Sequence, residues 1–531
     1  MTKFIFVTGG VLSSLGKGIL ASSIARLLKN AGVNASAMKI DPYLNCDAGT
    51  LNPYEHGETF VTRDGFECDL DVGNYERFLD VFANKEQNLM MGSVYRSVTD
   101  KERKGEFLGS TVQLIPHATN EIKERIRGTA KVTGADVLLV EIGGTVGDME
   151  SDVVLEAARQ MRFENGEGPS VLFVHLALVP TIITGEQKTK PLQHSVKALL
   201  SRGITPDIVV ARSEKMFTED AARKIALYCN VRPSEVYCSP NQKNIYRVPS
   251  VLKEQGILKS ISERLDLQLK DKKDAWDAML DQMEGAKKTR KIAVVGKYSG
   301  VMKDTYMSIF EALVHAAAQE EVKPEIELIS SEAIEKGKEE LSRFDGFLIP
   351  GGFGARGVEG KIECIRYARE HKKPLLGICY GFQLSIVETA RNLLGLKDAN
   401  TTEVNPQTRH PVIDILPEQR GVTEKGGTMR LGAYPVQIKP GTKAAELYSE
   451  EIQGGKILKR FRHRFEVNPK YVDKLEGAGW VFSGRDPHRE IMKAGEFKGH
   501  PFLFGVQYHP EFDSRLERPE PSYRGFVEAM K

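Results

Sequence analysis

Residues 374–383 constrain the fold of this chain more than any other segment. They read as an apolar strand, a short turn and the start of a helix, with Cys379 at the turn between Gly377 and Gly381. This is the cysteine form of the nucleophile elbow, a strand-to-helix turn that lifts a side chain clear of its sheet. The helix N-terminus beside the thiol favours the anionic form of the sulfur. The pattern therefore predicts a strand-turn-helix unit built around a cysteine nucleophile.

A candidate base and its orienting group lie near the C-terminus. His509 follows the apolar stretch 505–508, and Glu511 stands two residues beyond it. A thiol, an imidazole and a carboxylate in this order form a nucleophile, a base and a residue that orients the base. A lone cysteine in an apolar run is usually a small buried side chain. The glycine-flanked turn and the distant His-x-Glu together favour an activated Cys379.

Composition limits the class of protein. The chain has 531 residues, enough for two or three domains, and its 74 Lys and Arg against 72 Asp and Glu give a formal net charge of +2. This balance offers no electrostatic basis for a nucleic-acid or membrane partner. No apolar run is long enough for a signal peptide or a membrane span. The six cysteines form no C-x-x-C pair and no zinc spacing, so we expect a reduced, cytoplasmic protein.

Apolar runs predict two α/β halves. In the first half, strand-like runs alternate with helical stretches, which predicts a parallel sheet covered on both faces. These runs are residues 4–7, 137–140, 171–178 and 208–210. A fresh strand at 292–295 begins the second half, whose further strands are expected at 346–350 and 375–378. We therefore place one domain at 1–267 and another at 291–531.

The segment 268–290 between the two domains is rich in charge. Within it Trp276, Met279, Leu280 and Met283 recur with helical spacing. This spacing predicts an amphipathic linker helix whose apolar stripe packs against a neighbouring domain.

A glycine-rich turn follows the first strand. Gly16, Lys17 and Gly18 stand between that strand and a helix, where backbone N–H groups and a lysine bind phosphate. The turn differs from a standard P-loop, because five residues separate Gly10 from Gly16 and Gly18 replaces the magnesium-binding Ser or Thr. A metal ion at this site would need carboxylates from elsewhere.

Two carboxylates are candidates for that metal. Glu141 closes the apolar strand 137–141, at the edge of a parallel sheet where ligands bind. A charge buried there requires a cation. Asp71 lies shortly after Cys68, but local sequence does not distinguish it from Asp69.

A basic loop occupies residues 185–197. Lys188 and Lys190 bracket a threonine ahead of Pro191, and Gln193 carries an amide able to read a base edge or a ribose. In a chain that already has one phosphate site, this loop favours a second polyphosphate ligand, with Lys224 as a further cation.

At these residues the chain resembles the CTP synthase family, essentially from end to end. The string at 188–197 is the most discriminating match, because the second half alone resembles any class I glutamine amidotransferase. The matching stretches are residues 8–18, 39–43, 141–148, 188–197, 350–354, 377–383, 426–432 and 509–511.

The resemblance implies a dethiobiotin-synthetase-like synthase domain of the P-loop type (1–267), joined to a flavodoxin-like class I glutamine amidotransferase domain (291–531). In such a synthase ATP phosphorylates O4 of UTP, and ammonia from glutamine displaces the phosphate to give CTP. ATP would be bound by Ser14, Leu15, Gly16, Lys17, Gly18, Ile19, Lys39 and Asp71, with Mg²⁺ on Asp71 and Glu141. UTP would be held by Ser13, Lys188, Thr189, Lys190, Pro191, Leu192, Gln193 and Lys224. The inhibitor CTP would share these residues and turn its base toward Asp148, Met149 and Glu150.

For the second half, the resemblance implies that Cys379 attacks the glutamine carboxamide, with His509 as acid and base and Glu511 orienting it. The oxyanion hole would be formed by backbone N–H groups of Gly352 and Tyr380. Glutamine would be bound by Gly352, Tyr380, Gly381, Phe382, Gln383, Glu403 and Arg464. Tyr380 and Phe382 stand where other members often carry Leu and Met.

The resemblance also implies regulation and assembly. Residues 426–432 would form a lid that responds to the activator GTP, and His56 would lie near the passage for ammonia. We expect a homotetramer with no tightly bound organic cofactor.

Two other functions are compatible with parts of the chain. A cofactor-biosynthetic amidotransferase, such as a cobyrinate amidase, pairs a related ATPase fold with a glutaminase-like domain, but would lack the 188–197 string. A filament-forming protein without catalysis is the second, and it is disfavoured by the intact set Cys379, His509, Glu511, Lys17, Asp71 and Glu141.

Overall fold

The computed structural model describes residues 2–164, 170–270, 274–297, 303–422 and 426–531. The chain divides into two compact units. The first unit contains Met1–Ala48 and Asp71–Asp277, and the second contains Gly49–Leu70 and Ala278–Lys531. The short segment Gly49–Leu70 therefore packs with the C-terminal half, although the chain on either side of it belongs to the first unit.

The first unit is built on a seven-stranded sheet in which every neighbouring pair is parallel. Its strands are almost wholly buried, as expected for a parallel sheet covered on both faces. In spatial order they are β5 (Asn88–Met90), β2 (Ala35–Asp41), β6 (Val137–Ile142), β1 (Lys3–Gly10), β7 (Val171–Leu178), β8 (Ile208–Ser213) and β9 (Val236–Pro240).

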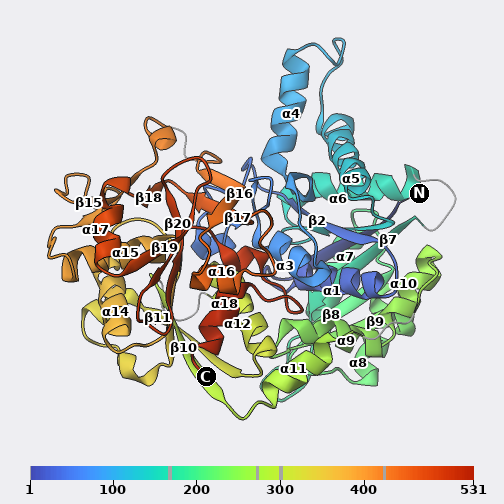
Figure 1. Cartoon of the computed structure of the whole chain (residues 1–531). Coiled ribbons are helices and arrows are strands. Elements are labelled where there is room, and N and C mark those ends of the chain that lie inside the picture. The colour runs from blue at the N-terminus through green and yellow to red at the C-terminus, as the bar shows by residue number, and fades with distance from the viewer. Residues whose placement is uncertain (1, 165–169, 271–273, 298–302, 423–425) are drawn as a thin grey trace. The chain divides into compact units, whose positions relative to one another are not determined.

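Helices follow the strands of this sheet in alternation, and the apolar cores lie between the helices and the sheet. Figure 1 shows α4 and α5 as the light-blue and cyan helices of this unit. The helices are α1 (Lys17–Asn30), α3 (Leu70–Leu79), α4 (Met91–Arg103), α5 (Thr119–Thr133), α6 (Asp152–Glu164), α7 (Lys190–Leu200), α8 (Glu219–Cys229), α9 (Val248–Glu254) and α10 (Ile257–Leu265).

The second unit contains a nine-stranded mixed sheet. Five strands are parallel, in the order β11 (Lys323–Ser330), β10 (Thr289–Gly296), β12 (Gly346–Ile349), β13 (Leu375–Ile378) and β21 (Leu503–Val506). This is the flavodoxin-like order, in which the first strand has neighbours on both sides. Four antiparallel strands extend it, namely β20 (Met492–Phe497), β19 (Trp480–Arg485), β16 (Arg430–Ile438) and β17 (Lys456–His463). The predicted class, two α/β domains with a parallel sheet in the first, is confirmed.

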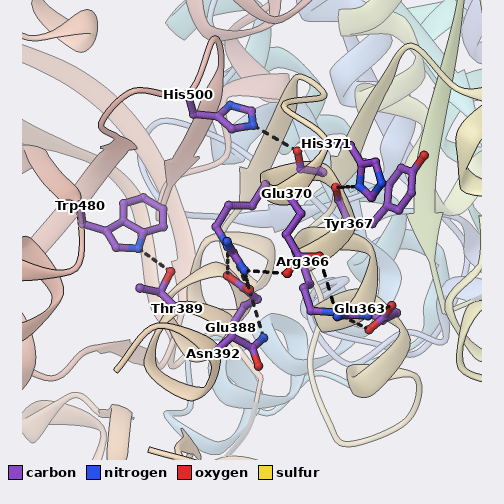
Figure 2. A network of polar contacts seen from close by, with 12 residues as sticks. Glu363, Arg366, Tyr367, Glu370, His371, Glu388, Thr389, Asn392, Trp480 and His500 are labelled. Carbon is purple, nitrogen blue, oxygen red and sulfur yellow. Dashed lines mark hydrogen bonds and ion pairs between the residues drawn. The ribbon is translucent and has the colours of Figure 1, made fainter. Parts of the chain in front are cut away.

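Separate cores cover the two faces of this sheet. One contains apolar residues of α12 (Met307–Gln319) and α18 (Pro521–Glu528), and the other those of α14 (Val358–Glu370) and α15 (Tyr380–Asn392). Figure 2 shows the polar network that joins α14 and α15 around Glu388. Arg369 of α14 donates to Glu388 of α15 at 2.8 Å, and Trp480 donates to Thr389 at 2.9 Å. The remaining elements are α13 (Ser331–Glu335), α16 (Lys443–Leu447), α17 (Val472–Gly477), β14 (Asn400–Thr401), β15 (Pro411–Ile415) and β18 (Phe465–Val467).

The segment Gly49–Leu70 is fixed to the rest of the second unit by partly buried polar contacts. It contains α2 (Pro53–His56) and the hairpin of β3 (Phe60–Val61) with β4 (Glu67–Cys68). Glu67 accepts from Arg462 at 2.8 Å, and Glu58 accepts from the backbone N–H of Ser308 at 3.0 Å. These pairs join residues more than 200 positions apart in the sequence, so no local sequence pattern predicts them.

The predicted linker is helical over part of its length. Within the described part of 268–290 the helix is α11 (Trp276–Glu284), while β10 already begins at Thr289. Trp276 and Leu280 are buried, which agrees with an apolar stripe that packs. Residues 271–273 lie outside the described part of the chain. The boundary between the two units falls within α11, after Asp277.

Candidate active sites

Cys379 occupies a strained turn between β13 and α15. Its backbone φ is 50° and ψ is −99°, a conformation that residues with a side chain rarely adopt. Neither flanking glycine has room for a Cβ atom. A Cβ on Gly381 would lie 2.1 Å from the carbonyl oxygen of Ile349, and one on Gly377 would lie 3.0 Å from the backbone of Gly381. The tight packing of strand, turn and helix thus requires both glycines and presents the thiol at the helix N-terminus.

His509 and Glu511 form a buried pair at the end of β21. Nδ1 of His509 lies 2.7 Å from Oε1 of Glu511. Burial disfavours the imidazolium and lowers the pKa of His509. The negative charges of the Glu511 carboxylate and of a Cys379 thiolate outweigh burial and raise this pKa to about 10. Nε2 of His509 has no hydrogen-bond partner within the described part of the chain. A buried, unpartnered nitrogen beside a thiol is suited to carry a proton for a reacting group.

A cavity of about 590 Å³ in the second unit brings these residues together. Its lining includes Cys379, His509 and Glu511 and four of the seven residues expected to bind glutamine, namely Gly352, Gln383, Glu403 and Arg464. Residues of Gly49–Leu70 also line it, among them Thr50 and Glu58, whereas His56 does not. A concave cavity with a few convergent polar groups is typical of a small-molecule site.

Opposite charges are present in this cavity. Glu403 accepts from the backbone N–H of Gly354 at 2.8 Å, and burial raises the pKa of its carboxyl group. Arg464 donates to Gln419 and, at 2.9 Å, to the hydroxyl of Thr428. Thr428 belongs to the predicted lid 426–432, which the structure describes in full; residues 423–425, just upstream of it, lie outside the described chain. A carboxylate and a guanidinium match the two charges of an α-amino acid.

The remaining residues expected at the glutamine site have other surroundings. Phe382 is fully buried in the core, with its ring 5.8 Å from that of Trp480 and packed against Gly505. Tyr380 donates its hydroxyl hydrogen to the carbonyl of Gly354 at 2.8 Å. Neither Tyr380 nor Phe382 is part of the cavity lining. Their presence where other family members often carry Leu and Met therefore changes the packing around the cavity rather than its surface.

Two further polar residues of this site were not predicted from the sequence. Gln507 donates to Sγ of Cys379 at 3.5 Å and lies in the same short string as His509, which was the available signal. Lys361 lines the cavity from α14, where nothing in the local sequence sets it apart from a surface lysine.

The first unit gathers the residues predicted to bind ATP. Gly16 has φ 93° and precedes the first residue of α1, Lys17, whose ammonium donates to the carbonyl of Gly144 at 2.7 Å. A Cβ on Gly18 would lie 1.8 Å from Oδ1 of Asp71, so the turn packs directly against that carboxylate. Burial lowers the pKa of the Lys17 ammonium against the attraction of Glu141. The expected order of strand, glycine turn, lysine and helix is present.

Lys39, Asp71 and Glu141 form a buried cluster at the carboxyl ends of β2 and β6. The ammonium of Lys39 contacts Asp71 and lies 3.4 Å from Oε1 of Glu141. Burial and the nearby charge of Asp71 raise the pKa of Glu141 to about 7. Tyr75 donates a hydrogen bond to Glu141 and orients it.

Two carboxylates that repel one another around a cation provide a donor set that suits Mg²⁺. Among the described residues no group of three or more His, Cys, Asp or Glu side chains is arranged to hold a metal. Mg²⁺ bound by Asp71 and Glu141 would therefore complete its coordination with phosphate oxygens and water, as it commonly does.

The predicted pyrimidine-nucleotide loop runs into α7. Lys190 is the first residue of that helix, and Gln193 donates to Thr189 at 2.9 Å. Lys188 forms an exposed ion pair with Glu186 at 2.7 Å. The remaining predicted residues, Ser13 and Lys224, are exposed, while Pro191 and Leu192 belong to the first turn of α7.

A buried histidine connects this helix to the glycine turn. Nδ1 of His175 lies 2.9 Å from Oγ1 of Thr8, and its Nε2 lies 2.7 Å from Oγ of Ser195. Burial lowers the pKa of His175 to about 3, so the ring is neutral and serves as a hydrogen-bonding link.

The residues expected to meet the base of CTP lie after β6. Asp148 accepts from the backbone N–H of Thr145 at 3.2 Å, and Met149 is 85% exposed. Glu150 is also exposed. These side chains are open to a ligand.

Comparison with known proteins covers both units. The profile of the family CTP synthase N-terminus matches residues 3–267, and that of Glutamine amidotransferase class-I matches residues 301–529. The chain is 53% identical to the CTP synthase of Thermococcus kodakarensis over 100% of this chain and 99% of the relative. It is 51% identical to a CTP synthase of Thermus thermophilus, over 99% and 96% respectively. A solved glutaminase domain of Trypanosoma brucei CTPS with bound acivicin is 34% identical, with a TM-score of 0.43, over 45% of this chain and 93% of that domain.

Proposed function

This chain belongs to the CTP synthase family, and we propose that it aminates UTP through a 4-phosphorylated intermediate, using ATP and ammonia that it releases from glutamine. One observation carries the glutaminase half of this proposal. The cavity of the second unit contains a strained cysteine, a buried histidine–carboxylate pair and both charges needed to bind an amino acid.

In the glutaminase reaction, the thiolate of Cys379 attacks the carboxamide carbon of glutamine. The oxygen of the tetrahedral intermediate accepts hydrogen bonds from backbone N–H groups of Gly352 and Tyr380. His509 gives its proton to the leaving nitrogen, so that ammonia departs and a glutamyl thioester remains. Water then adds to the thioester with His509 as base, and glutamate leaves. Glu403 binds the ammonium of the substrate and Arg464 its carboxylate.

In the synthase reaction, the γ-phosphoryl group of ATP moves to O4 of UTP and ADP is released. Ammonia then attacks C4, phosphate leaves, and loss of a proton gives CTP. The turn of Ser14 to Ile19 with Lys17 and Lys39 binds the ATP phosphates, and Lys188 to Gln193 with Ser13 and Lys224 hold the UTP triphosphate. Mg²⁺ on Asp71 and Glu141 would neutralise charge on the transferred group.

The regulatory and quaternary features are proposed on the same basis. CTP would inhibit by occupying the UTP triphosphate site with its base near Asp148, Met149 and Glu150, and GTP would activate glutamine hydrolysis through the lid 426–432. We also propose a homotetramer in the cytoplasm. No helix among the described residues is long and apolar enough to cross a membrane, and the six cysteines form no disulfide.

The decisive experiment is an assay of CTP formation from UTP and ATP, with glutamine and added ammonia compared side by side. Synthesis from both donors supports the two-site mechanism. Absence of CTP with ammonia and UTP, in a folded and nucleotide-bound sample, would refute it. Calorimetric titration with UTP separates this function from that of a cofactor-biosynthetic amidotransferase, for which no UTP binding is expected.

A further inference from the structure

Lys361 is a buried lysine with no ionic partner among the residues that the structure describes. It lies on α14 and is 2% exposed. No hydrogen bond or ion pair joins its ammonium to any other described residue. Its Nζ lies 5.5 Å from the centroid of the Tyr380 ring. By contrast, Lys459 and Lys493, which are buried in the same unit, each contact a buried glutamate.

An unpaired ammonium in the protein interior is costly, because it has lost its hydration and gained no counter-charge. Burial, with a further contribution from the charge of Lys297, lowers the pKa of Lys361 to about 7. The negative charge of a Cys379 thiolate opposes this shift and raises the pKa of Lys361. A residue that costs stability in its resting state is a candidate for a role in function.

The position of the ammonium indicates what that role is. A Cβ on Gly352 would lie 3.9 Å from Nζ of Lys361 and 3.9 Å from Cδ1 of Tyr380. The ammonium therefore lies beside both residues whose backbone N–H groups form the proposed oxyanion hole. Lys361 and Cys379 also line the same cavity.

Side-chain contacts join α14 to the neighbouring helix α15. Arg369 and Glu388 connect it to α15, the helix that begins directly after Cys379 (Figure 2). Glu359 of α14 also pairs with Arg391 of α15 at 2.8 Å. Both ties join the helix that carries Lys361 to the helix that follows the elbow.

We propose that Lys361 is a positioning residue of the glutaminase step, whose ammonium acts through the oxyanion hole and stabilises the negative charge that develops on the amide oxygen of glutamine. Fixed charges near a developing oxyanion lower the barrier because they require no reorganisation during the reaction. The charge is most useful in the tetrahedral intermediate, where the negative charge has moved onto the oxygen held by the backbone N–H groups of Gly352 and Tyr380. This inference rests on the proposed glutaminase function.

The test replaces Lys361 with Met or with Gln and measures glutamine hydrolysis and thermal stability together. Exposed Lys338 of the same unit, changed to Met, serves as the matched control and should alter neither quantity. In Lys361→Met we expect kcat to fall about ten-fold or more while KM stays within two-fold, since the lost interaction forms in the transition state. The melting temperature should remain equal or rise, because a buried unpaired charge has been removed. Lys361→Gln should lose as much kcat as Lys361→Met.

Three results would overturn the proposal. A rise in KM at unchanged kcat would make Lys361 a ligand of bound glutamine. A fall in melting temperature that accompanies the loss of kcat would make its role structural. Retained kcat in Lys361→Gln would show that hydrogen bonding suffices without charge. If the unchanged protein released no ammonia from glutamine, the glutaminase function itself would be refuted.

Discussion

Nδ1 of His509 lies 2.7 Å from Oε1 of Glu511, and the opposite nitrogen of the ring lies in the cavity of Cys379 without a hydrogen-bond partner in the described chain. The carboxylate therefore fixes both the tautomer and the direction of the ring, and leaves Nε2 for the substrate. This geometry is reached because Pro510 and Glu511 begin a short 3₁₀ turn directly after the histidine, which brings the carboxylate back to the ring.

Glu511→Gln should impair glutamine hydrolysis severely without disturbing substrate binding. The amide no longer stabilises an imidazolium, so we expect kcat to fall by about 10²- to 10⁴-fold, by analogy with the loss of the orienting carboxylate in serine proteases. Steady-state kinetics with glutamine as the varied substrate would measure this. A loss below about three-fold would mean that Glu511 does not orient His509.

Cys379→Ala should separate the two nitrogen donors. Because added ammonia bypasses the thioester, we expect loss of glutamine-dependent CTP synthesis with ammonia-dependent synthesis retained. The contrasting variant is Lys17→Ala, which removes a cation from the proposed ATP site and should abolish synthesis from both donors. If both donors were lost in a folded Cys379→Ala protein, the two sites would not be independent.

Gly381→Ala should destabilise the second unit, because the new Cβ would overlap the carbonyl oxygen of Ile349 at 2.1 Å. We expect the free energy of unfolding to fall by about 2–3 kcal/mol, as for other overpacked core sites. Gly477→Ala is the matched control in the same unit, since a Cβ there meets no atom within 4 Å and the change should stay below about 1 kcal/mol. Denaturant titration of both variants measures these free energies of unfolding. Equal stability of Gly381→Ala and Gly477→Ala would mean that the close contact at Gly381 does not exist.

Lys361 should make the stability of the protein depend on alkaline pH. Its pKa is about 7 in the folded protein against an ordinary value of 10.5, so between these values the unfolded chain binds more protons than the folded one. Stability contributed by this group therefore rises as pH increases from 7 toward 10. Lys361→Met lacks this dependence, so its advantage in melting temperature over the unchanged protein should shrink between pH 7 and pH 9. If the advantage of Lys361→Met grew with pH, the pKa of Lys361 would not be depressed. Lys297 and Cys379, whose charges act on Lys361, are present in both proteins, so the comparison isolates Lys361.

Short motifs made much of the site predictable. The glycine-flanked Cys379, the His509–Glu511 spacing and the Lys17 turn are local patterns, and each occupies the strand-to-helix or strand-to-turn junction that its chemistry requires. Only the family resemblance distinguished Asp71 from Asp69 as the metal ligand. In the structure Asp71 contacts the ammonium of Lys39, which places it beside Glu141.

The sequence by itself determined the class of fold and predicted two chemical centres and a nucleophile, because strand-turn-helix patterns and glycine requirements are local. The tertiary structure alone decided that Gly49–Leu70 completes the cavity of the second unit, that Phe382 fills the core, and that Lys361 is buried beside Gly352 and Tyr380. These facts depend on contacts between residues far apart in the chain, where burial and the surrounding charges, rather than residue type, set the properties of a side chain.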